Sequence, residues 1–320
     1  MLCSLSLFKA IKKKYPDSHI TLVASKTNYE IPFFEINPYI NRVLIYDKSS
    51  SKTVLNFYKQ LRDRKYQYGF VPSTIKISRT SHLINFFSGA KVRVGVNSVD
   101  GTKSKSAFLL NLKDDFTWKN KHQLVRNLEI ARLAGFELTD DELDKIKFSF
   151  TENEITFAKM FLKENFNNSP KKIIAFHPGA GKKVNSYPTE KFIQLIKMIY
   201  QKYRNHILIT SGWTDDLIIN KIKSDLDNEK IEYTIAHNFP VKKLGAILSH
   251  VDLYITNDTG TMHIAGFSGA RMISLFGPTN PYEWAPMNKN SFFIKSQTEK
   301  IEDIAVEEIY TLAERVIELK

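Results

Sequence analysis

The residues best suited to chemistry lie in the segment Asn257–His263, where Asp258, Thr259, Gly260 and His263 follow an apolar run and open a helical pattern. Such a turn presents unpaired backbone N–H groups and the positive end of a helix dipole, which together favour a phosphate or diphosphate. Gly260 permits close backbone approach, Thr259 supplies a hydroxyl, and His263 lies about one helical turn further on. Alternatively, Asp258 or Thr259 caps the helix and His263 packs in the core; helix physics alone supports both interpretations equally.

A second loop, His177–Lys183, also follows an apolar run and contains Gly179, Ala180 and Lys182. Small residues beside lysines suit another phosphate contact. The loop is not a Walker A motif, because phenylalanine and lysine stand where that motif needs glycine and serine or threonine. Taken alone, it is better explained as an ordinary strand-to-helix turn.

Two further loops have the same position at the end of an apolar run. In Ser211–Asp216, the carboxylate of Asp216, or of its neighbour Asp215, could accept hydrogen bonds from ribose hydroxyls. Helix capping by Thr214 explains this loop better without further context. Phe276–Pro281 is rich in turn-forming residues and follows a predicted strand. It is either a turn that only ends the strand or a segment that closes over a ligand.

Composition excludes several classes of protein. The 320 residues include one cysteine, Cys3, which rules out an intramolecular disulfide and multi-cysteine zinc sites and fits a reducing compartment. No apolar run approaches the ~18 residues of a membrane span. The net charge of +12 either indicates an anionic partner or reflects a composition rich in lysine, asparagine and isoleucine throughout the chain. The basic residues are spread and no nucleic-acid-binding motif occurs, which argues against nucleic acid. No Gly-x-Gly-x-x-Gly is present, which disfavours a nicotinamide dehydrogenase.

Short apolar runs alternate with amphipathic stretches, which predicts an α/β fold with parallel sheets. We expect two doubly wound domains, 1–150 and 151–320, with a closing helix at about 303–319 and ligands at the carboxyl ends of the strands. The predicted strands are 20–24, 43–46, 68–71, 172–176, 206–210, 233–236, 252–256 and 271–276. Residues 97–120 have weak periodicity and are expected to form a loop or irregular crossover.

The loops together resemble glycosyltransferase family 9, the lipopolysaccharide heptosyltransferases. The matching segments, in order, are His177–Lys182, Tyr187–Pro188, Asp258–Gly260 with His263, and Phe276–Thr279. The likeness is strong over residues 172–296 and weak over residues 5–96.

The resemblance implies a GT-B fold, with two Rossmann-like domains facing a cleft and the glycan acceptor on the first. It implies an inverting transferase that moves a heptose-type sugar from a nucleotide diphosphate, typically ADP-heptose, to a phosphorylated lipopolysaccharide core. The nucleotide-sugar is a substrate, and no cofactor or metal is expected. The implied setting is cytoplasmic, peripheral at the inner membrane, without nucleic acid. The donor-binding positions would be Gly179, Ala180, Lys182, Asp216 (or Asp215), Asp258, Thr259, Gly260 and His263.

Two departures from the family pattern stand out. Where the family often has Lys-Arg-Trp-Pro, this chain has Asn-Ser-Tyr-Pro at 185–188, so Lys182 or Lys183 would supply the missing charge. Family members also begin with a strand and a Gly-Asp loop, and that aspartate, the expected general base, would lie upstream of Met1. The chain itself then holds no catalytic residue. We expect a truncated start, a gap with apolar edges in the first sheet, an intact donor site and poor turnover. The alternative is a catalytically inactive nucleotide-sugar-binding protein that natively lacks the base.

Overall fold

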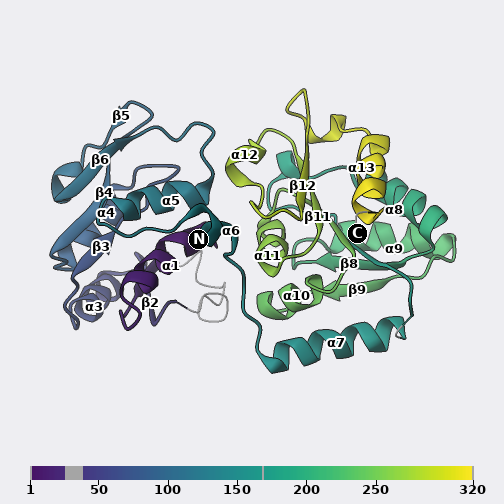
Figure 1. Ribbon diagram of the computed structural model, residues 1–320, viewed down its shortest axis with the longest axis horizontal. Helices are drawn as coiled ribbons and strands as arrows, with labels where there is room; N and C mark the ends of the chain where they lie inside the picture. Colours follow the sequence, from purple (N-terminus) through teal and green to yellow (C-terminus); the bar gives the residue numbers. More distant parts are fainter. Residues whose placement is uncertain (1, 26–38, 168, 319–320) are drawn as a thin grey trace. The chain divides into compact units, whose positions relative to one another are not determined.

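The computed structural model describes residues 2–25, 39–167 and 169–318, so Met1 and the last two residues, which include the end of the expected closing helix, lie outside it. The chain forms two compact units, Met1–Ile146 and Lys147–Lys320 (Figure 1). In the part of the chain that is described, no helix is both long and apolar enough to cross a bilayer.

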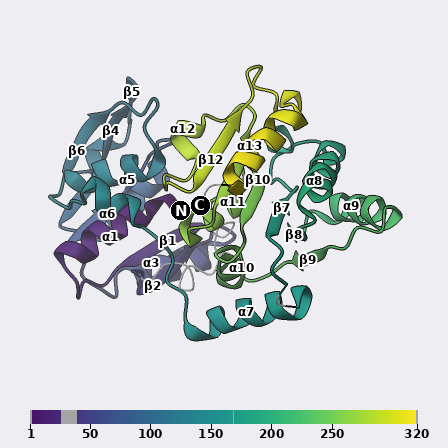
Figure 2. The same cartoon turned by 45° about the vertical axis from the view of Figure 1, so that its right-hand side comes forward.

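The second unit is built on a six-stranded, wholly parallel sheet in the order β12-β11-β10-β7-β8-β9 (Figure 2). Helices cover both faces, so the central strands are buried and read as nearly continuous apolar runs. The strands are β7 (Ile173–His177), β8 (His206–Ser211), β9 (Thr234–His237), β10 (Leu253–Asn257), β11 (Met272–Phe276) and β12 (Ser291–Lys295).

The helices of this unit fall into two packed groups. In one group α8 packs against α9 and α13, and in the other α10 packs against α7 and α11. Their bounds are α7 (Glu152–Phe166), α8 (Thr189–Tyr203), α9 (Asp216–Asn228), α10 (Val241–Leu248), α11 (Gly260–Ser268), α12 (Pro281–Trp284) and α13 (Val306–Glu318). The alternation of strand and helix predicted for this half of the chain is confirmed. The sequence did not indicate β12, which is an edge strand with only one buried residue, Ile294.

The first unit contains two separate sheets. Strands β1 (Thr21–Ser25) and β2 (Arg42–Tyr46) pair in parallel, and β3 (Tyr68–Phe70), β4 (Val92–Val99) and β6 (Leu112–Phe116) form a second parallel set. The short β5 (Thr102–Lys103) pairs antiparallel with β4. The helices are α1 (Leu5–Lys14), α3 (Ser51–Leu61), α4 (Arg79–Phe87), α5 (Gln123–Arg132) and α6 (Asp140–Asp144).

The prediction that residues 97–120 lack regular structure is wrong, because β6 lies within them and pairs with β4. The three middle residues of β6, Lys113 to Asp115, are exposed, so this edge strand carries no apolar pattern by which it could be predicted. Its last residue, Phe116, is stacked on the buried Trp118, with ring centroids 4.5 Å apart. That aromatic pair holds the end of the strand against the core.

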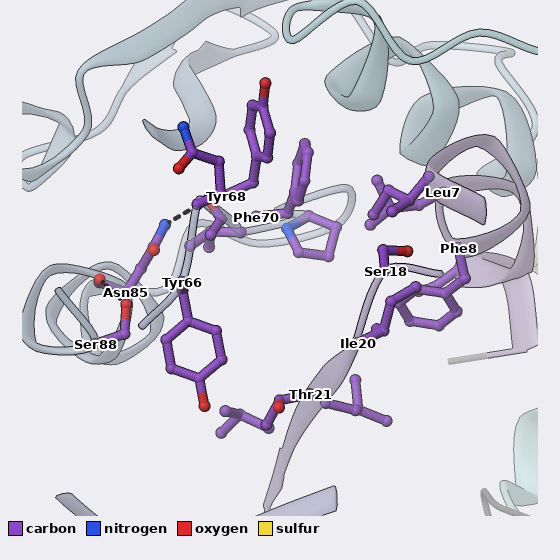
Figure 3. A pocket seen from close by; sticks show the side chains of 18 of the residues that line it. Leu7, Phe8, Ser18, Ile20, Thr21, Tyr66, Tyr68, Phe70, Asn85 and Ser88 are labelled. Carbon is purple, nitrogen blue, oxygen red and sulfur yellow. Dashed lines mark hydrogen bonds between the residues drawn. The ribbon is translucent and has the colours of Figure 1, made fainter. Parts of the chain in front are cut away.

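The gap expected in the first sheet is confirmed. Among the described strands, β1 pairs only with β2 and β3 only with β4. A cavity of about 1160 Å³ is lined by Thr21, Leu22 and Val23 from β1 and by Tyr68, Gly69 and Phe70 from β3 (Figure 3). The sheet is thus interrupted between these two strands.

Candidate functional site

Asn257, at the carboxyl end of β10, connects two parts of the site by hydrogen bonds. The register of β10 against β7 places Thr256 beside His177, so Asn257 reaches the loop that follows β7. Its buried side-chain amide donates to the carbonyls of Pro178 and Gly179, over 2.9 and 3.1 Å. Its Oδ1 accepts from the backbone N–H of Tyr187 over 3.2 Å. One side chain therefore fixes the loop after β7 to the turn that opens α11.

Asp258 is the next residue and is half-buried. The Asn185 amide donates to its Oδ2 over 3.0 Å and to its carbonyl over 3.2 Å. Burial raises the pKa of Asp258, while a hydrogen bond with Thr279 and the charge of Lys182 act in the opposite direction. Asn185 is neutral where the family pattern often has lysine, and Lys182 is the basic side chain whose charge acts on Asp258 here. The turns after β7, β10 and β11 therefore all converge on Asp258.

The first turn of α11 is open. Thr259 occupies the N-cap position in an extended conformation, φ −149° and ψ 174°, and its side chain makes no capping hydrogen bond. Gly260 is exposed, and a Cβ atom built on it meets no heavy atom within 4 Å. The structure therefore does not support the interpretation that Thr259 merely caps the helix, and it leaves room for a ligand at the positive end of the dipole.

His263 lies on α11 and is half-buried, so it is not a core histidine. Its ring centroid is 6.2 Å from that of Trp284, at the end of α12, and the two rings are inclined by 56°. The sequence placed His263 near Thr259 on the helix, and the structure adds the indole of Trp284 as its aromatic neighbour.

His177, Thr210 and Asp215 form a buried cluster behind the loop after β7. The Nδ1 atom of His177 lies 3.0 Å from both the carbonyl and the hydroxyl of Thr210. Burial lowers the pKa of His177, and the opposing charge of Asp215 only partly offsets this effect. His177 therefore lies behind the loop, where burial disfavours its charged form.

Asp215 is buried and accepts a hydrogen bond from the N–H of Gly212 over 2.7 Å. A Cβ atom at Gly179 would lie 2.4 Å from an Asp215 carboxylate oxygen, so the carboxylate rests directly on the loop after β7. Asp216 is exposed on the first turn of α9. Of the two acids that the resemblance offered for the ribose, Asp215 is the one placed beside Gly179 and Ala180.

Two aromatic residues near this loop were not identified from the sequence. Trp213 is 83% exposed, and its ring centroid is 6.3 Å from that of His237, which ends β9. The Nδ1 atom of His237 lies 2.8 Å from the hydroxyl of Ser211. The one signal available in the sequence was a tryptophan in a loop expected at the end of a strand.

The proposed donor positions thus all lie at the carboxyl edge of the second sheet. The structure brings together the loop of Gly179, Ala180 and Lys182 with Asp258 and the open turn of Thr259 and Gly260. Asp216 lies on the exposed first turn of α9, outside these contacts.

Comparison with known proteins gives a consistent result. The sequence profile of glycosyltransferase family 9 (heptosyltransferase) matches residues 54–312. Lipopolysaccharide core heptosyltransferase OpsX from Haemophilus influenzae is 23% identical over 287 residues, covering 89% of this chain and 78% of that protein. Lipopolysaccharide heptosyltransferase 3 from Escherichia coli K12 is 23% identical over 297 residues, covering 91% of this chain and 83% of that protein.

Two solved structures share the fold. The glycosyl transferase family 9 protein from Veillonella parvula superposes with a TM-score of 0.79 at 17% identity, covering 99% of this chain and 93% of that one. Escherichia coli ADP-heptose lipopolysaccharide heptosyltransferase II gives a TM-score of 0.76 at 18% identity, covering 99% and 95%. The expected α/β fold of the GT-B type is confirmed.

Proposed function

Because the chain belongs to glycosyltransferase family 9, we propose that it transfers a heptose-type sugar from ADP-heptose to a lipopolysaccharide core acceptor, with inversion at the anomeric carbon. The relatives named above are heptosyltransferases of lipopolysaccharide. The net charge of +12 suits a glycolipid acceptor at an anionic membrane surface. We place the enzyme in the cytoplasm, in peripheral contact with the inner membrane.

The single observation that carries this proposal is the open first turn of α11, held beside the loop after β7 by Asn257 and Asn185. In this arrangement the backbone N–H groups at Thr259 and Gly260 bind the donor diphosphate, and Lys182 adds a positive charge. These groups stabilise the charge that develops on the leaving diphosphate, which is how a site can work without a metal. His263 and Asp258 border the sugar.

The nucleoside lies over the loops after β7 and β8. Asp215 is buried against Gly179 and orients the loop on which the ribose rests. The exposed ring of Trp213 offers a face on which an adenine can stack. This part of the site selects the nucleotide, whereas the turn at Gly260 binds the diphosphate.

In the transfer step, an acceptor hydroxyl attacks the anomeric carbon on the face opposite the diphosphate. A general base takes the hydroxyl proton, and the diphosphate leaves with the electron pair of the broken C–O bond. The donor site described above binds the nucleotide-sugar and stabilises the diphosphate as it leaves.

Isothermal titration calorimetry with ADP-heptose, and competition with ADP, UDP and GDP, tests the donor assignment. We expect ADP to compete best, whereas tightest binding of UDP or GDP would overturn the adenine assignment. Turnover with a heptose-free core acceptor, followed by NMR of the new anomeric centre, tests inversion. Unchanged turnover in EDTA tests metal independence. Donor binding without turnover would favour the inactive binding protein.

A further inference from the structure

Four aromatic side chains of the first unit lie in a row at its surface. We call them the aromatic row, which runs in the order Phe86, Phe87, Tyr58, Tyr46. Successive ring centroids are 5.5, 5.7 and 6.3 Å apart, and each pair meets edge to face. Phe86 and Phe87, at the end of α4, are 44% and 46% exposed, and the two tyrosines are half-buried. Contiguous exposed side chains of this size mark a surface that contacts another body.

A cation lies over each end of the aromatic row. The guanidinium of Arg93 is 5.4 Å from the ring centroid of Phe86, and the Nζ atom of Lys48 is 5.6 Å from that of Tyr46. The guanidinium also donates to two backbone carbonyls, over 2.8 and 3.0 Å, which fixes its position without neutralising its charge. The row is therefore an apolar surface with a positive charge at each end.

Helix α3, which carries the third ring of the row, extends this surface. Its buried residues, Phe57 and Leu61, are one turn apart and belong to the core. Leu55 lies on the opposite face of the helix and is 73% exposed. Lys52 and Lys59 are exposed on that same face, about one turn before and one turn after Leu55. Such a face can place its leucine in lipid while the lysine ammonium groups stay among the headgroups.

The excess of positive charge belongs to the first unit. Lysine and arginine are spread over both units, 24 in residues 1–146 and 22 in residues 147–320, whereas aspartate and glutamate number 14 and 20. The net charge is therefore +10 for the first unit and +2 for the second. Residues 39–99, which include the aromatic row and α3, contain eleven lysines and arginines but only two acids, Asp47 and Asp63. Asp63 is paired with Arg42 over 2.7 Å. The surroundings of the row thus attract an anionic partner.

We propose that the aromatic row and the outer face of α3 form a membrane-docking surface for a bilayer that contains anionic lipid. The rings and Leu55 enter the boundary between headgroups and acyl chains, and the surrounding cations bind the headgroups. A second copy of the chain fits less well, because a symmetric contact places the cations of one copy against those of the other. The inference rests on the peripheral membrane contact proposed above and adds the surface that makes it.

Co-sedimentation of the full chain with vesicles tests this surface. One set of vesicles contains phosphatidylcholine alone, and the other contains equal parts of phosphatidylcholine and phosphatidylglycerol, both without lipopolysaccharide. We expect binding to the anionic vesicles to be at least about tenfold tighter and to weaken as the salt concentration rises.

An apolar substitution in each unit locates the contact. Leu55→Gln should weaken binding to the anionic vesicles by about fivefold or more, because one apolar side chain no longer enters the lipid. The matched control is Met160→Gln on α7 of the second unit, where the side chain is 54% exposed. This control should bind the vesicles as the wild type does.

A charge substitution in each unit separates local from overall charge. The double variant Lys52→Gln, Lys59→Gln should weaken vesicle binding by about tenfold at low salt. The control Lys159→Gln, Lys163→Gln removes the same charge from two exposed lysines of α7 and should have a much smaller effect. All four variants should keep the wild-type melting temperature and the wild-type affinity for ADP, which shows that the fold and the donor site are intact.

Several results would overturn the proposal. They are equal binding to the two kinds of vesicle, binding to neither, and equal effects of the matched variants in the two units. A dimer in sedimentation velocity that Leu55→Gln abolishes would instead assign this face to a second copy of the chain. The vesicles hold neither donor nor acceptor, so a failure of the transferase assignment leaves the vesicle result unchanged, and a failure of docking leaves donor binding unchanged.

Discussion

The side-chain amide of Asn185 donates a hydrogen bond to the carboxylate of Asp258 over 3.0 Å. A neutral donor binds a carboxylate without cancelling its charge, so burial remains the largest influence on Asp258 and raises its pKa. Lys182 opposes that shift through its charge alone. The turn that we assign to the diphosphate therefore has an exposed cation at its border, the side chain of Lys182.

The raised pKa of Asp258 has a measurable consequence for stability. Because the folded state binds the proton more tightly than the unfolded state, the free energy of unfolding should fall as the pH rises from 3.8, the ordinary value, through the raised pKa. Asp258→Asn removes this dependence. Denaturant unfolding of both proteins between about pH 3.5 and 7 should show wild-type stability declining relative to the variant within this window.

Comparing the wild type with the Asp258→Asn variant cancels the contributions that the other titrating groups make to the pH dependence of stability. Glu142, for example, has a pKa of about 2, chiefly because Lys13 donates a hydrogen bond to it, and this group is the same in both. A stability difference that increased with pH in favour of the wild type would contradict the burial argument.

Lys182 and its neighbour Lys183 form a natural pair of variant and control. Both are exposed, but only Lys182 acts on Asp258. Lys182→Met should weaken ADP binding by about tenfold, which corresponds to ~1.4 kcal/mol, and should reduce the dependence of affinity on salt. Calorimetry at two ionic strengths measures both effects. An equal loss of ADP affinity in Lys183→Met would show that the effect comes from the net charge of the loop and not from Lys182 itself.

The substitution Gly260→Ala tests whether position 260 contacts the donor, because the added methyl group should affect donor binding without disturbing the protein. The added methyl group meets no protein atom within 4 Å, and alanine favours the helix over glycine by up to about 1 kcal/mol. We therefore expect an unchanged or raised melting temperature together with at least about tenfold weaker donor binding. Wild-type affinity in a stable variant would mean that the diphosphate does not approach this turn.

Asp215 and Asp216 can be distinguished by the same substitution to asparagine. Asp215 is buried, accepts from Gly212 and rests on Gly179, whereas Asp216 is exposed. Asp215→Asn should lower both the melting temperature and the affinity for ADP. Asp216→Asn should leave stability within about 0.5 kcal/mol of wild type and leave affinity unchanged. The reverse ranking in calorimetry would assign the ribose to Asp216.

The elements that could be predicted from the sequence are those whose burial requires a continuous apolar run. Strands β10 and β11 are wholly buried and appear as apolar runs, so the turn at Asp258 could be placed at a strand end. The edge strand β6 is largely exposed and left no such pattern. Strand β12 is mostly half-buried, and its short apolar run, Phe292 to Ile294, does not by itself distinguish a strand from a buried helix segment.

The contacts within the site could not be predicted in the same way. Asn185 and Asp258 are separated by 73 residues and meet only because β10 lies beside β7 in one particular register. The choice between Asp215 and Asp216 likewise depends on where α9 begins, which a sequence pattern locates only to within a few residues.

Gly179 and Asp215 are packed so closely that the loop has no room for any side chain at position 179. In a randomised library selected only for correct folding, position 179 would return glycine, whereas positions 181 and 260, which face open space, would accept small side chains. Selection for sugar transfer should then remove the substitutions at position 260. The candidate site thus contains glycines retained for two different reasons, and the two kinds of selection would tell them apart.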